Sequence, residues 1–89
     1  MDLVEARKRI GVVDEQMASL FVERMEAARA VAACKREAGL PIEDKAQEAH
    51  VIERGVALVA DDELRPYYVE FLQNLMKLSK DWQRHLLEK

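Results

Sequence analysis

The fold is decided by residues 3–34, which read LVEARKRIGVVDEQMASLFVERMEAARAVAAC. Apolar or small side chains recur there at alternating steps of three and four residues, the spacing of one face of an α-helix. These side chains, called the seam below, are Leu3, Ala6, Ile10, Val13, Met17, Leu20, Ala27, Val31 and Cys34. Arg24 occupies a position of the seam, and no carboxylate lies three or four residues from it. Because a guanidinium keeps its charge, we expect Arg24 to meet an anion from another helix, another chain or a ligand.

The whole chain divides into three predicted helices with short connections. The first covers about residues 2–38, because it holds no proline and ends at a Gly-Leu-Pro turn. The second covers about residues 44–59, with acidic side chains at its start. The third covers about residues 66–87, with a proline in its first turn. The predicted fold class is therefore all-α, with three helices in a single domain that spans residues 1–89.

The first helix is too long for a monomer of this size. At 1.5 Å per residue it spans roughly 55 Å, whereas a compact chain of 89 residues is roughly 30 Å across. About half of the seam would therefore lie in water. A second copy of the chain is the most economical cover, so we predict an obligate, intertwined helical homodimer.

The composition limits the function classes. The chain has 89 residues, of which 49% are hydrophobic and 35% charged, with a net charge of −3. An acidic balance without a basic run argues against nucleic acid as a partner. No signal peptide or apolar run of bilayer-spanning length is recognisable, so no membrane partner is expected. The single cysteine cannot form an internal disulfide, and a reducing, cytoplasmic location is expected.

Three cations within the first predicted helix lack a local partner, and so does Arg36, which lies beside Glu37 at the end of the helix. Arg7, Arg24 and Lys35 have no carboxylate three or four residues away, the spacing at which helical charges pair. Arg24 and Lys35 share a face to within roughly 20° and lie roughly 16 Å apart, so both side chains can reach one small anion. Arg7 lies roughly 25 Å from Arg24 along the helix, and an antiparallel partner helix is needed to bring it there.

Polar side chains of the other two helices complete a predicted pocket. Ser79 and Gln83 interrupt the apolar strip of the third helix, while Asp44 and Glu48 share a face of the second. The set holds no nucleophile beside a base, no glycine-rich phosphate loop and no metal-binding cluster. Cations, an amide, a hydroxyl and carboxylates together suit a small molecule with two carboxylates and a hydroxyl. Its reaction would be driven by positioning and electrostatics.

The order and spacing of these residues resemble the all-helical chorismate mutase family (AroQ class) in its small single-domain form. The residues that carry the resemblance are Arg7, Ile10, Asp14, Leu20, Glu23, Arg24, Lys35, Pro41, Asp44, Glu48, Ser79 and Gln83. The resemblance implies a Claisen rearrangement of chorismate to prephenate, a step of phenylalanine and tyrosine biosynthesis, with no cofactor, metal or covalent intermediate. It also implies an intertwined dimer with two equal sites, each of which takes Arg7 from the other protomer.

The resemblance further implies a role for each site residue. Arg7 and Arg24 would clamp the substrate carboxylates. Lys35 and Gln83 would donate hydrogen bonds to the ether oxygen, where negative charge develops. Glu48 would accept a hydrogen bond from the ring hydroxyl. The further binding positions would be Asp44, Gln47 and Ser79.

The chain departs from better-known members of that family at two positions. Gln47 stands where they often have arginine, and Glu43 stands where they have another basic residue. Gln47 can still donate a hydrogen bond, but one positive charge near the substrate is lost. Weaker substrate binding, or activation by a partner enzyme or fused domain of the same pathway, is therefore expected.

Structural alternatives accompany these assignments. Arg24 can be a snorkelling or salt-bridged side chain, Lys35 a solvated lysine, and Asp44 a charge at a helix N-terminus. Ser79 and Gln83 can form a polar edge of the apolar strip. Three other functions also stay open: an isochorismate-pyruvate lyase of the same fold, a mutase domain cut from a fused enzyme, and a non-catalytic helical dimerisation module of a shikimate-pathway complex.

Overall fold

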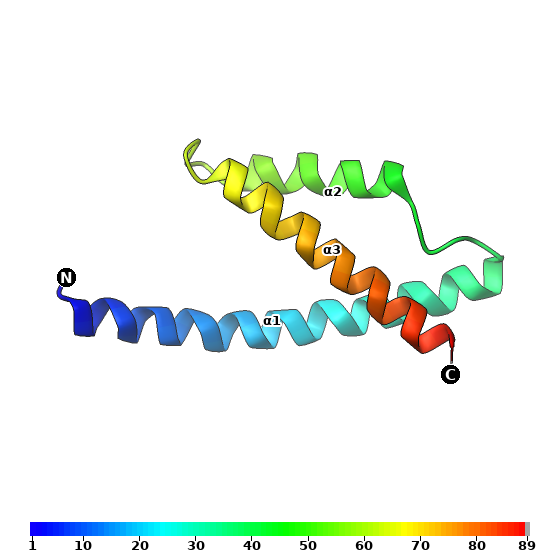
Figure 1. Ribbon diagram of the computed structural model, residues 1–89, viewed down its shortest axis with the longest axis horizontal. Helices are drawn as coiled ribbons and strands as arrows, with labels where there is room; N and C mark the ends of the chain where they lie inside the picture. Colours follow the sequence, from blue (N-terminus) through cyan, green and yellow to red (C-terminus); the bar gives the residue numbers. More distant parts are fainter. Residues whose placement is uncertain (89) are drawn as a thin grey trace.

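The computed structural model describes residues 1–88, which form three α-helices joined by two connections. The helices are α1 (Leu3–Ala38), α2 (Lys45–Leu58) and α3 (Arg65–Leu87). Figure 1 shows α1 as a long rod, α2 running back above it, and α3 crossing diagonally from the end of α2 to the C-terminal half of α1. No strand is present in residues 1–88, so the predicted all-α class with three helices is confirmed. Each helix begins and ends within one residue of its predicted bounds.

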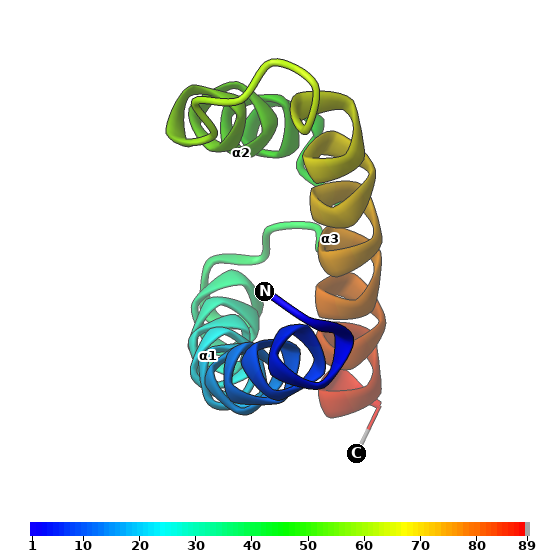
Figure 2. The ribbon, with the colours of Figure 1, turned by 90° about the vertical axis from the view of Figure 1, so that its left-hand side faces the viewer.

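The three helices form an open bracket. Within residues 1–88, α3 packs against both other helices, whereas α1 and α2 do not pack on each other. In Figure 2, α3 is the back of the bracket, and α1 and α2 are its two arms. The chain is elongated, with extents of 53 × 28 × 14 Å. None of the helices in the described residues carries an apolar stretch long enough to cross a membrane.

Capping residues fix both ends of α1. The Asp2 carboxylate accepts a hydrogen bond from the Glu5 backbone N–H at 2.8 Å, which satisfies a free donor of the first turn. Gly39 ends the helix in the left-handed conformation, with a φ of 68°, which glycine adopts without steric cost. The Leu40 N–H then donates to the Lys35 carbonyl at 2.8 Å. Beyond this turn the chain reverses toward α2 (Figure 1).

Side-chain contacts also fix the connection between α2 and α3. Arg65 Nε donates to the Val59 carbonyl at 2.7 Å, and Arg65 Nη1 pairs with Asp62 at 2.8 Å. Pro66 lies in the first turn of α3, where its missing N–H removes no helical hydrogen bond. These contacts close the turn from which α3 sets out toward α1.

The small core lies along α3, where it meets the other two helices. Its buried hydrophobic residues are Ala28, Ala32, Leu72 and Met76. Gly55 of α2 is also buried, and a Cβ at this position would overlap Leu72 Cδ1 and lie 3.2 Å from Tyr68 Cε2. Glycine at this point therefore permits the close approach of α2 to α3.

Trp82 fastens α3 to α1 at their crossing. Its indole Nε1 donates to the Met25 carbonyl at 3.1 Å. The Arg29 guanidinium lies over the indole, 5.3 Å from the ring centroid, where a cation is attracted by the π-face. His85 stacks against the same ring system, with centroids 5.9 Å apart. The cluster holds the crossing point one residue before Gln83.

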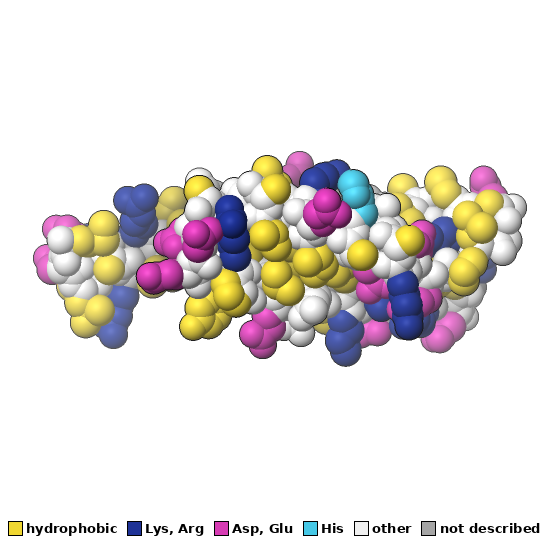
Figure 3. Space-filling view, turned by 90° about the horizontal axis from the view of Figure 1, so that it is seen from above, with side chains coloured by type: hydrophobic (Ala, Val, Ile, Leu, Met, Phe, Trp, Pro, Cys, Tyr) yellow, Lys and Arg dark blue, Asp and Glu magenta, His cyan; other side chains and the backbone are white. Residues whose placement is uncertain are grey.

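The seam of α1 remains largely uncovered by the chain's own helices. In the N-terminal half of α1, defined here as residues 3–22, Ile10, Met17 and Leu20 are between 48% and 61% exposed. Figure 3 shows this part of α1 projecting from the rest of the molecule, with hydrophobic side chains on its surface. In the C-terminal half, residues 24–38, the positions buried by the fold are Ala28 and Ala32, each adjacent to a seam residue. The described residues 1–88 therefore leave the N-terminal part of the seam largely uncovered, with Ala6 alone partly buried.

Candidate active site

A pocket of about 310 Å³ lies between α1 and α2, with α3 forming part of its wall. Seven of the eight residues predicted for the site line it: Arg24, Lys35, Asp44, Gln47, Glu48, Ser79 and Gln83. The apolar part of the wall consists of Ala27, Ala28, Val31, Ile42, Val51 and Met76. Because α1 and α2 are held apart by α3, polar groups from all three helices can line one open pocket.

Arg7, the eighth predicted residue, does not line this pocket. It lies in the N-terminal half of α1 and is exposed. One chain therefore brings together seven of the predicted side chains and leaves Arg7 apart.

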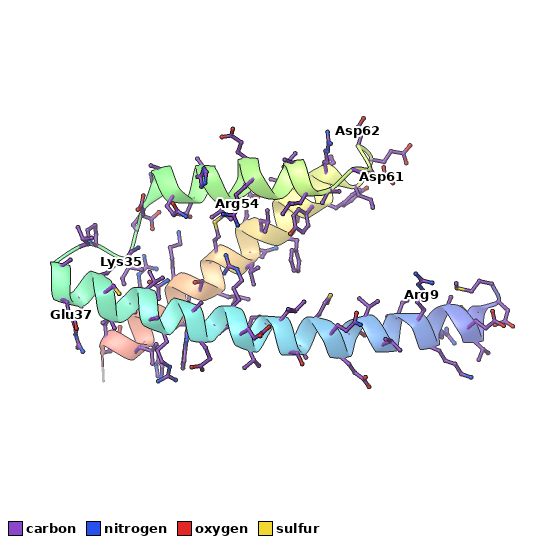
Figure 4. The ribbon with its side chains drawn as sticks, turned by 180° about the vertical axis from the view of Figure 1, so that it is seen from behind. Arg9, Lys35, Glu37, Arg54, Asp61 and Asp62 are labelled. Atoms are coloured by element: carbon purple, nitrogen blue, oxygen red, sulfur yellow. The ribbon has the colours of Figure 1, made fainter. Side chains whose placement is uncertain are left out.

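The two cations of α1 in the pocket have different surroundings. Lys35 Nζ donates to the Ile42 carbonyl at 2.7 Å, which ties it to the connection between α1 and α2. Figure 4 shows Lys35 on the side of α1 that faces this connection, whereas Glu37 points away from it. Arg24 is half-buried, and no carboxylate of residues 1–88 pairs with it. We expected the anion that pairs with Arg24 to come from another helix, another chain or a ligand. The described helices of the same chain do not supply it.

Asp44 and Gln47 line the pocket at the start of α2, and Asp44 also caps this helix. Its Oδ1 accepts a hydrogen bond from the Gln47 backbone N–H at 3.0 Å. The structural alternative for Asp44, a carboxylate at a helix N-terminus, is therefore observed. The cap fixes the first turn of α2 against the pocket, since both residues belong to its wall.

Ser79 and Gln83 lie on successive turns of α3 and are both buried. Gln83 Nε2 donates to Ser79 Oγ at 3.3 Å, whereas Gln83 Oε1 has no hydrogen-bond partner within residues 1–88. A buried polar atom without a partner costs about 1–3 kcal/mol. A serine hydroxyl can donate as well as accept. If the amide turns over, Oε1 accepts from Ser79 and Nε2 becomes free to donate to a ligand.

Glu48 is held by Lys80, a cation that is absent from the predicted site. Lys80 Nζ lies 3.1 Å from Glu48 Oε1 and 3.2 Å from Glu43 Oε2, so one ammonium bridges two carboxylates. Arg84 adds a longer contact to Glu43, at 3.6 Å. The second oxygen of Glu48, Oε2, is buried and has no partner within the described residues. Glu48 thus has one oxygen fixed by Lys80 and one free acceptor.

The bridge favours the charged forms of Lys80 and Glu43. Hydrogen bonds to Glu48 and then to Glu43 raise the pKa of Lys80 above its usual value. The hydrogen bond from Lys80, supported by the charges of Lys80, Arg84 and Lys45, lowers the pKa of Glu43. Ordinary values are about 10.4 for lysine and 4.3 for glutamate, so both shifts move the groups further from neutrality and favour the ion pair.

The sequence carries a signal for Lys80 of the same kind as for Arg24 and Lys35. No carboxylate lies three or four residues from Lys80 along α3, so its partners have to come from another segment. The criterion that selects Arg24 and Lys35 on α1, the absence of a carboxylate three or four residues away, therefore also selects Lys80 on α3.

A second hollow, called the apolar groove below, lies between α1 and α3 and has a volume of about 750 Å³. Its apolar lining consists of Met17, Ala18, Leu20, Phe21, Tyr68, Phe71, Leu75 and Leu78. Arg24 lines both the apolar groove and the pocket. Arg24, which interrupts the seam, therefore lies at the border between the pocket and the apolar groove.

The fold and the pocket together define a class of protein. The pocket wall presents Arg24, Lys35 and Lys80 together with a hydroxyl, two amides and two carboxylates. Groups of this kind bind a small anion and stabilise charge that develops on it. Within residues 1–88, no three His, Cys, Asp or Glu side chains cluster closely enough to hold a metal ion. The class is a small all-α protein whose pocket combines apolar walls with cations and polar groups suited to a small anion.

Comparison with known proteins assigns the family. Residues 6–84 match the family described as chorismate mutase type II. The chain is also similar to the chorismate mutase of Methanocaldococcus jannaschii, with 30% identity over 87 residues that cover 97% of this chain and 88% of that protein. No solved structure matches the chain. The chain therefore belongs to the chorismate mutase type II family and is an isomerase with that activity, which favours the mutase over the lyase and the non-catalytic module.

Proposed function

We propose that the chain converts chorismate to prephenate in this pocket by holding the substrate in a reactive conformation and stabilising developing charge, without a covalent intermediate. The observation that carries the proposal is the meeting of Arg24, Lys35 and Gln83, from two helices, in one pocket. Membership of the chorismate mutase type II family supplies the reaction to which this geometry is applied.

The reaction itself requires no external reagent. The ether C–O bond of chorismate breaks while a new C–C bond forms within the same molecule, so no proton or group is exchanged with the protein. Negative charge develops on the ether oxygen as its bond breaks. Hydrogen-bond donors directed at that oxygen lower the barrier, and the loss of one such donor costs ~3 kcal/mol. Lys35 and Gln83 have this role in the proposal.

Gln83 becomes a donor to the substrate when its amide turns over. In the free chain Nε2 is occupied by Ser79, while Oε1 is buried without a partner. After the turnover, Oε1 accepts from the Ser79 hydroxyl and Nε2 donates to the ether oxygen. Substrate binding then also satisfies an acceptor that is unpaired in the free chain.

The substrate carboxylates are assigned to Arg24 and to Arg7 of the partner subunit. Arg24 has no carboxylate partner in residues 1–88, so its charge is available to a ligand. Lys35 donates to one backbone carbonyl, and an ammonium has three donors, so it can keep this contact while it binds the substrate. Glu48 Oε2 accepts from the ring hydroxyl. The remaining polar contacts come from Asp44, Gln47 and Ser79.

A second copy of the chain completes the site in this proposal. Met17 and Leu20 of the exposed seam also line the apolar groove, so seam and groove join into one uncovered apolar surface, a feature that marks protein–protein contact sites. An antiparallel α1 from a partner fits it, because the partner's seam is itself apolar. The same arrangement carries Arg7 of the partner subunit toward Arg24, at the border of groove and pocket. The proposed assembly is an intertwined homodimer with two shared sites.

Product identification tests the proposed function directly. The purified chain is incubated with chorismate, and chorismate, prephenate and pyruvate are quantified by chromatography against a sample without protein. We expect chorismate to be replaced by an equal amount of prephenate, with no pyruvate. Release of pyruvate from isochorismate in a parallel reaction would indicate a lyase instead. No turnover of either substrate would contradict a catalytic role.

A further inference from the structure

Lys80 is the one cation of the pocket wall to which the roles above assign no function. It lies on α3 beside Ser79, and its side chain is 21% exposed. Its ammonium reaches Glu48 on α2 at 3.1 Å and Glu43 in the α1–α2 connection at 3.2 Å. Because these residues come from three segments, one side chain ties the α3 part of the pocket wall to the α2 part.

We propose that Lys80 is a positioning residue of this pocket, which acts on substrate binding by orienting and neutralising Glu48. The inference rests on the proposed role of Glu48 as acceptor for the substrate hydroxyl. Lys80 occupies Glu48 Oε1 and leaves Oε2 as the free acceptor. A carboxylate anchored through one oxygen cannot rotate freely, so its second oxygen keeps one direction in the absence of substrate.

Lys80 also neutralises the negative charge of Glu48, which would otherwise face a dicarboxylate substrate. The lining holds three cations, Arg24, Lys35 and Lys80, and two carboxylates, Asp44 and Glu48, which together give a formal charge of +1. Without Lys80 the formal charge is zero, and Glu48 becomes an uncompensated negative group near a doubly negative substrate. Like charges repel strongly in a partly buried site, so the loss of Lys80 should weaken binding in particular.

Glu43 is the outer partner of the bridge and keeps Lys80 in place. Its side chain is 42% exposed, against 28% for Glu48, and it does not line the pocket. Arg84 gives Glu43 a second cation at 3.6 Å. The raised pKa of Lys80, caused by hydrogen bonds to Glu48 and Glu43, keeps the ammonium charged at neutral pH, as the bridge requires.

Steady-state kinetics of the full chain with chorismate test the proposal. Lys80→Gln removes the charge and keeps a donor, whereas Lys80→Met removes both. For each we expect a KM roughly tenfold or more above that of the parent, because the charge-assisted contact between the Lys80 ammonium and Glu48 is lost, and a smaller change in kcat. Lys77→Met is the matched control, because Lys77 lies on the same helix, is 70% exposed and pairs with Asp81 outside the pocket. Its KM should stay within about twofold of the parent.

A double-mutant cycle separates positioning from direct substrate contact. Lys80→Met should raise KM little in a Glu48→Gln background, because Lys80 acts through Glu48. Lys80→Arg should recover part of the affinity, since a guanidinium can also bridge two carboxylates. Circular dichroism verifies the fold of each variant. If Lys80→Met does not fold, Lys80→Gln replaces it in the measurement of KM.

Two results would overturn the inference: additive effects in the cycle, or a KM within about twofold of the parent for the neutral Lys80 variants. If the parent itself does not turn over chorismate, the proposed function fails instead. The two failures are therefore distinguishable in one set of measurements.

Discussion

The two halves of α1 carry one continuous seam but meet different surroundings. In the C-terminal half, residues 24–38, α3 covers Ala28 and Ala32, and Lys35 is tied to the Ile42 carbonyl. In the N-terminal half, residues 3–22, every residue except Ala6 is exposed. The helix is regular along both halves, so the difference lies in what each half contacts. A periodic apolar pattern predicts that a face is buried, but it does not identify the element that buries it.

The largest expected effect compares one cation from each half. Arg7→Ala and Lys35→Ala should each abolish measurable activity, because a carboxylate clamp or the ether-oxygen donor is lost; one lost donor alone costs ~3 kcal/mol, on the order of a hundredfold in rate. When the two inactive variants are refolded together, a heterodimer has one site with both lesions and one site with neither. Chorismate turnover should therefore recover in part.

The outcome of the mixing experiment depends on which chain supplies Arg7. Each variant refolded alone is the control and should stay inactive. If heterodimers are verified by tagged pull-down and activity does not return, Arg7 serves the pocket of its own chain, and the proposed division between the two halves of α1 is wrong.

The second effect concerns the uncovered half alone. Leu20→Asp should abolish dimerisation, because a seam position buried by the partner would then hold a carboxylate. Val22→Asp is the matched control: the two side chains are 61% and 58% exposed in the single chain, but they lie roughly 200° apart around the helix. Sedimentation at low micromolar concentration should give a dimer for the parent and for Val22→Asp. A folded, compact monomer for the parent would contradict the dimer.

The third effect concerns Gln83 of α3, which lines the pocket together with Arg24 and Lys35 from the C-terminal half of α1. In Gln83→Glu, the carboxylate present at pH 7.5 faces the developing negative charge, so kcat/KM should fall by on the order of a hundredfold. As the pH falls toward 5, the added carboxyl takes up a proton and can donate again, so the rate should recover. Gln73→Glu, at an exposed position of α3, controls for the added charge. A Gln83→Glu variant that matches the parent across this range would exclude the donor role.

The smallest effect compares Gly11, in the uncovered half of α1, with Gly55, which is packed between α2 and α3. Gly55→Ala should destabilise the fold by about 1–3 kcal/mol, because its Cβ would overlap Leu72. Gly11→Ala has nothing within 4 Å in the single chain, and alanine is the better helix former by about 1 kcal/mol. Urea denaturation should therefore show a loss for the first variant and a gain for the second. A loss at Gly11 would indicate that the partner helix lies directly against it.

Much of the fold is predictable because the signals that start and end its helices are local. Gly39 needs a left-handed backbone, Asp44 caps α2, and Pro66 suits a first helical turn, and each of these signals acts within a few residues. The position of α3 between the other two helices does not depend on such local signals. It depends on the contact of Gly55 with Leu72, residues far apart in the chain, and no periodic pattern specifies that pairing.

Part of the candidate site was predictable, because a cation with no carboxylate three or four residues away is expected to bind a distant group. This criterion selected Arg7, Arg24 and Lys35, of which Arg24 and Lys35 line the pocket of the single chain and Arg7 does not. It says nothing about which distant group the cation meets, so the Lys80 bridge to Glu43 and Glu48, across 37 and 32 residues, required the structure. The unpaired oxygen of Gln83 is likewise a property of packing, because it arises from the burial of α3 against its neighbours.

The chain has a single tryptophan, and its position gives the molecule an intrinsic optical reporter. The hydrogen bond from Trp82 to the Met25 carbonyl and the Arg29 cation over the indole exist only while α3 is seated on α1. The fluorescence emission of Trp82 therefore reports whether α3 is packed on the covered half of α1. Sedimentation reports whether the uncovered half is bound to the partner. A denaturant titration monitored both ways would give the order in which the two contacts break, without any attached label.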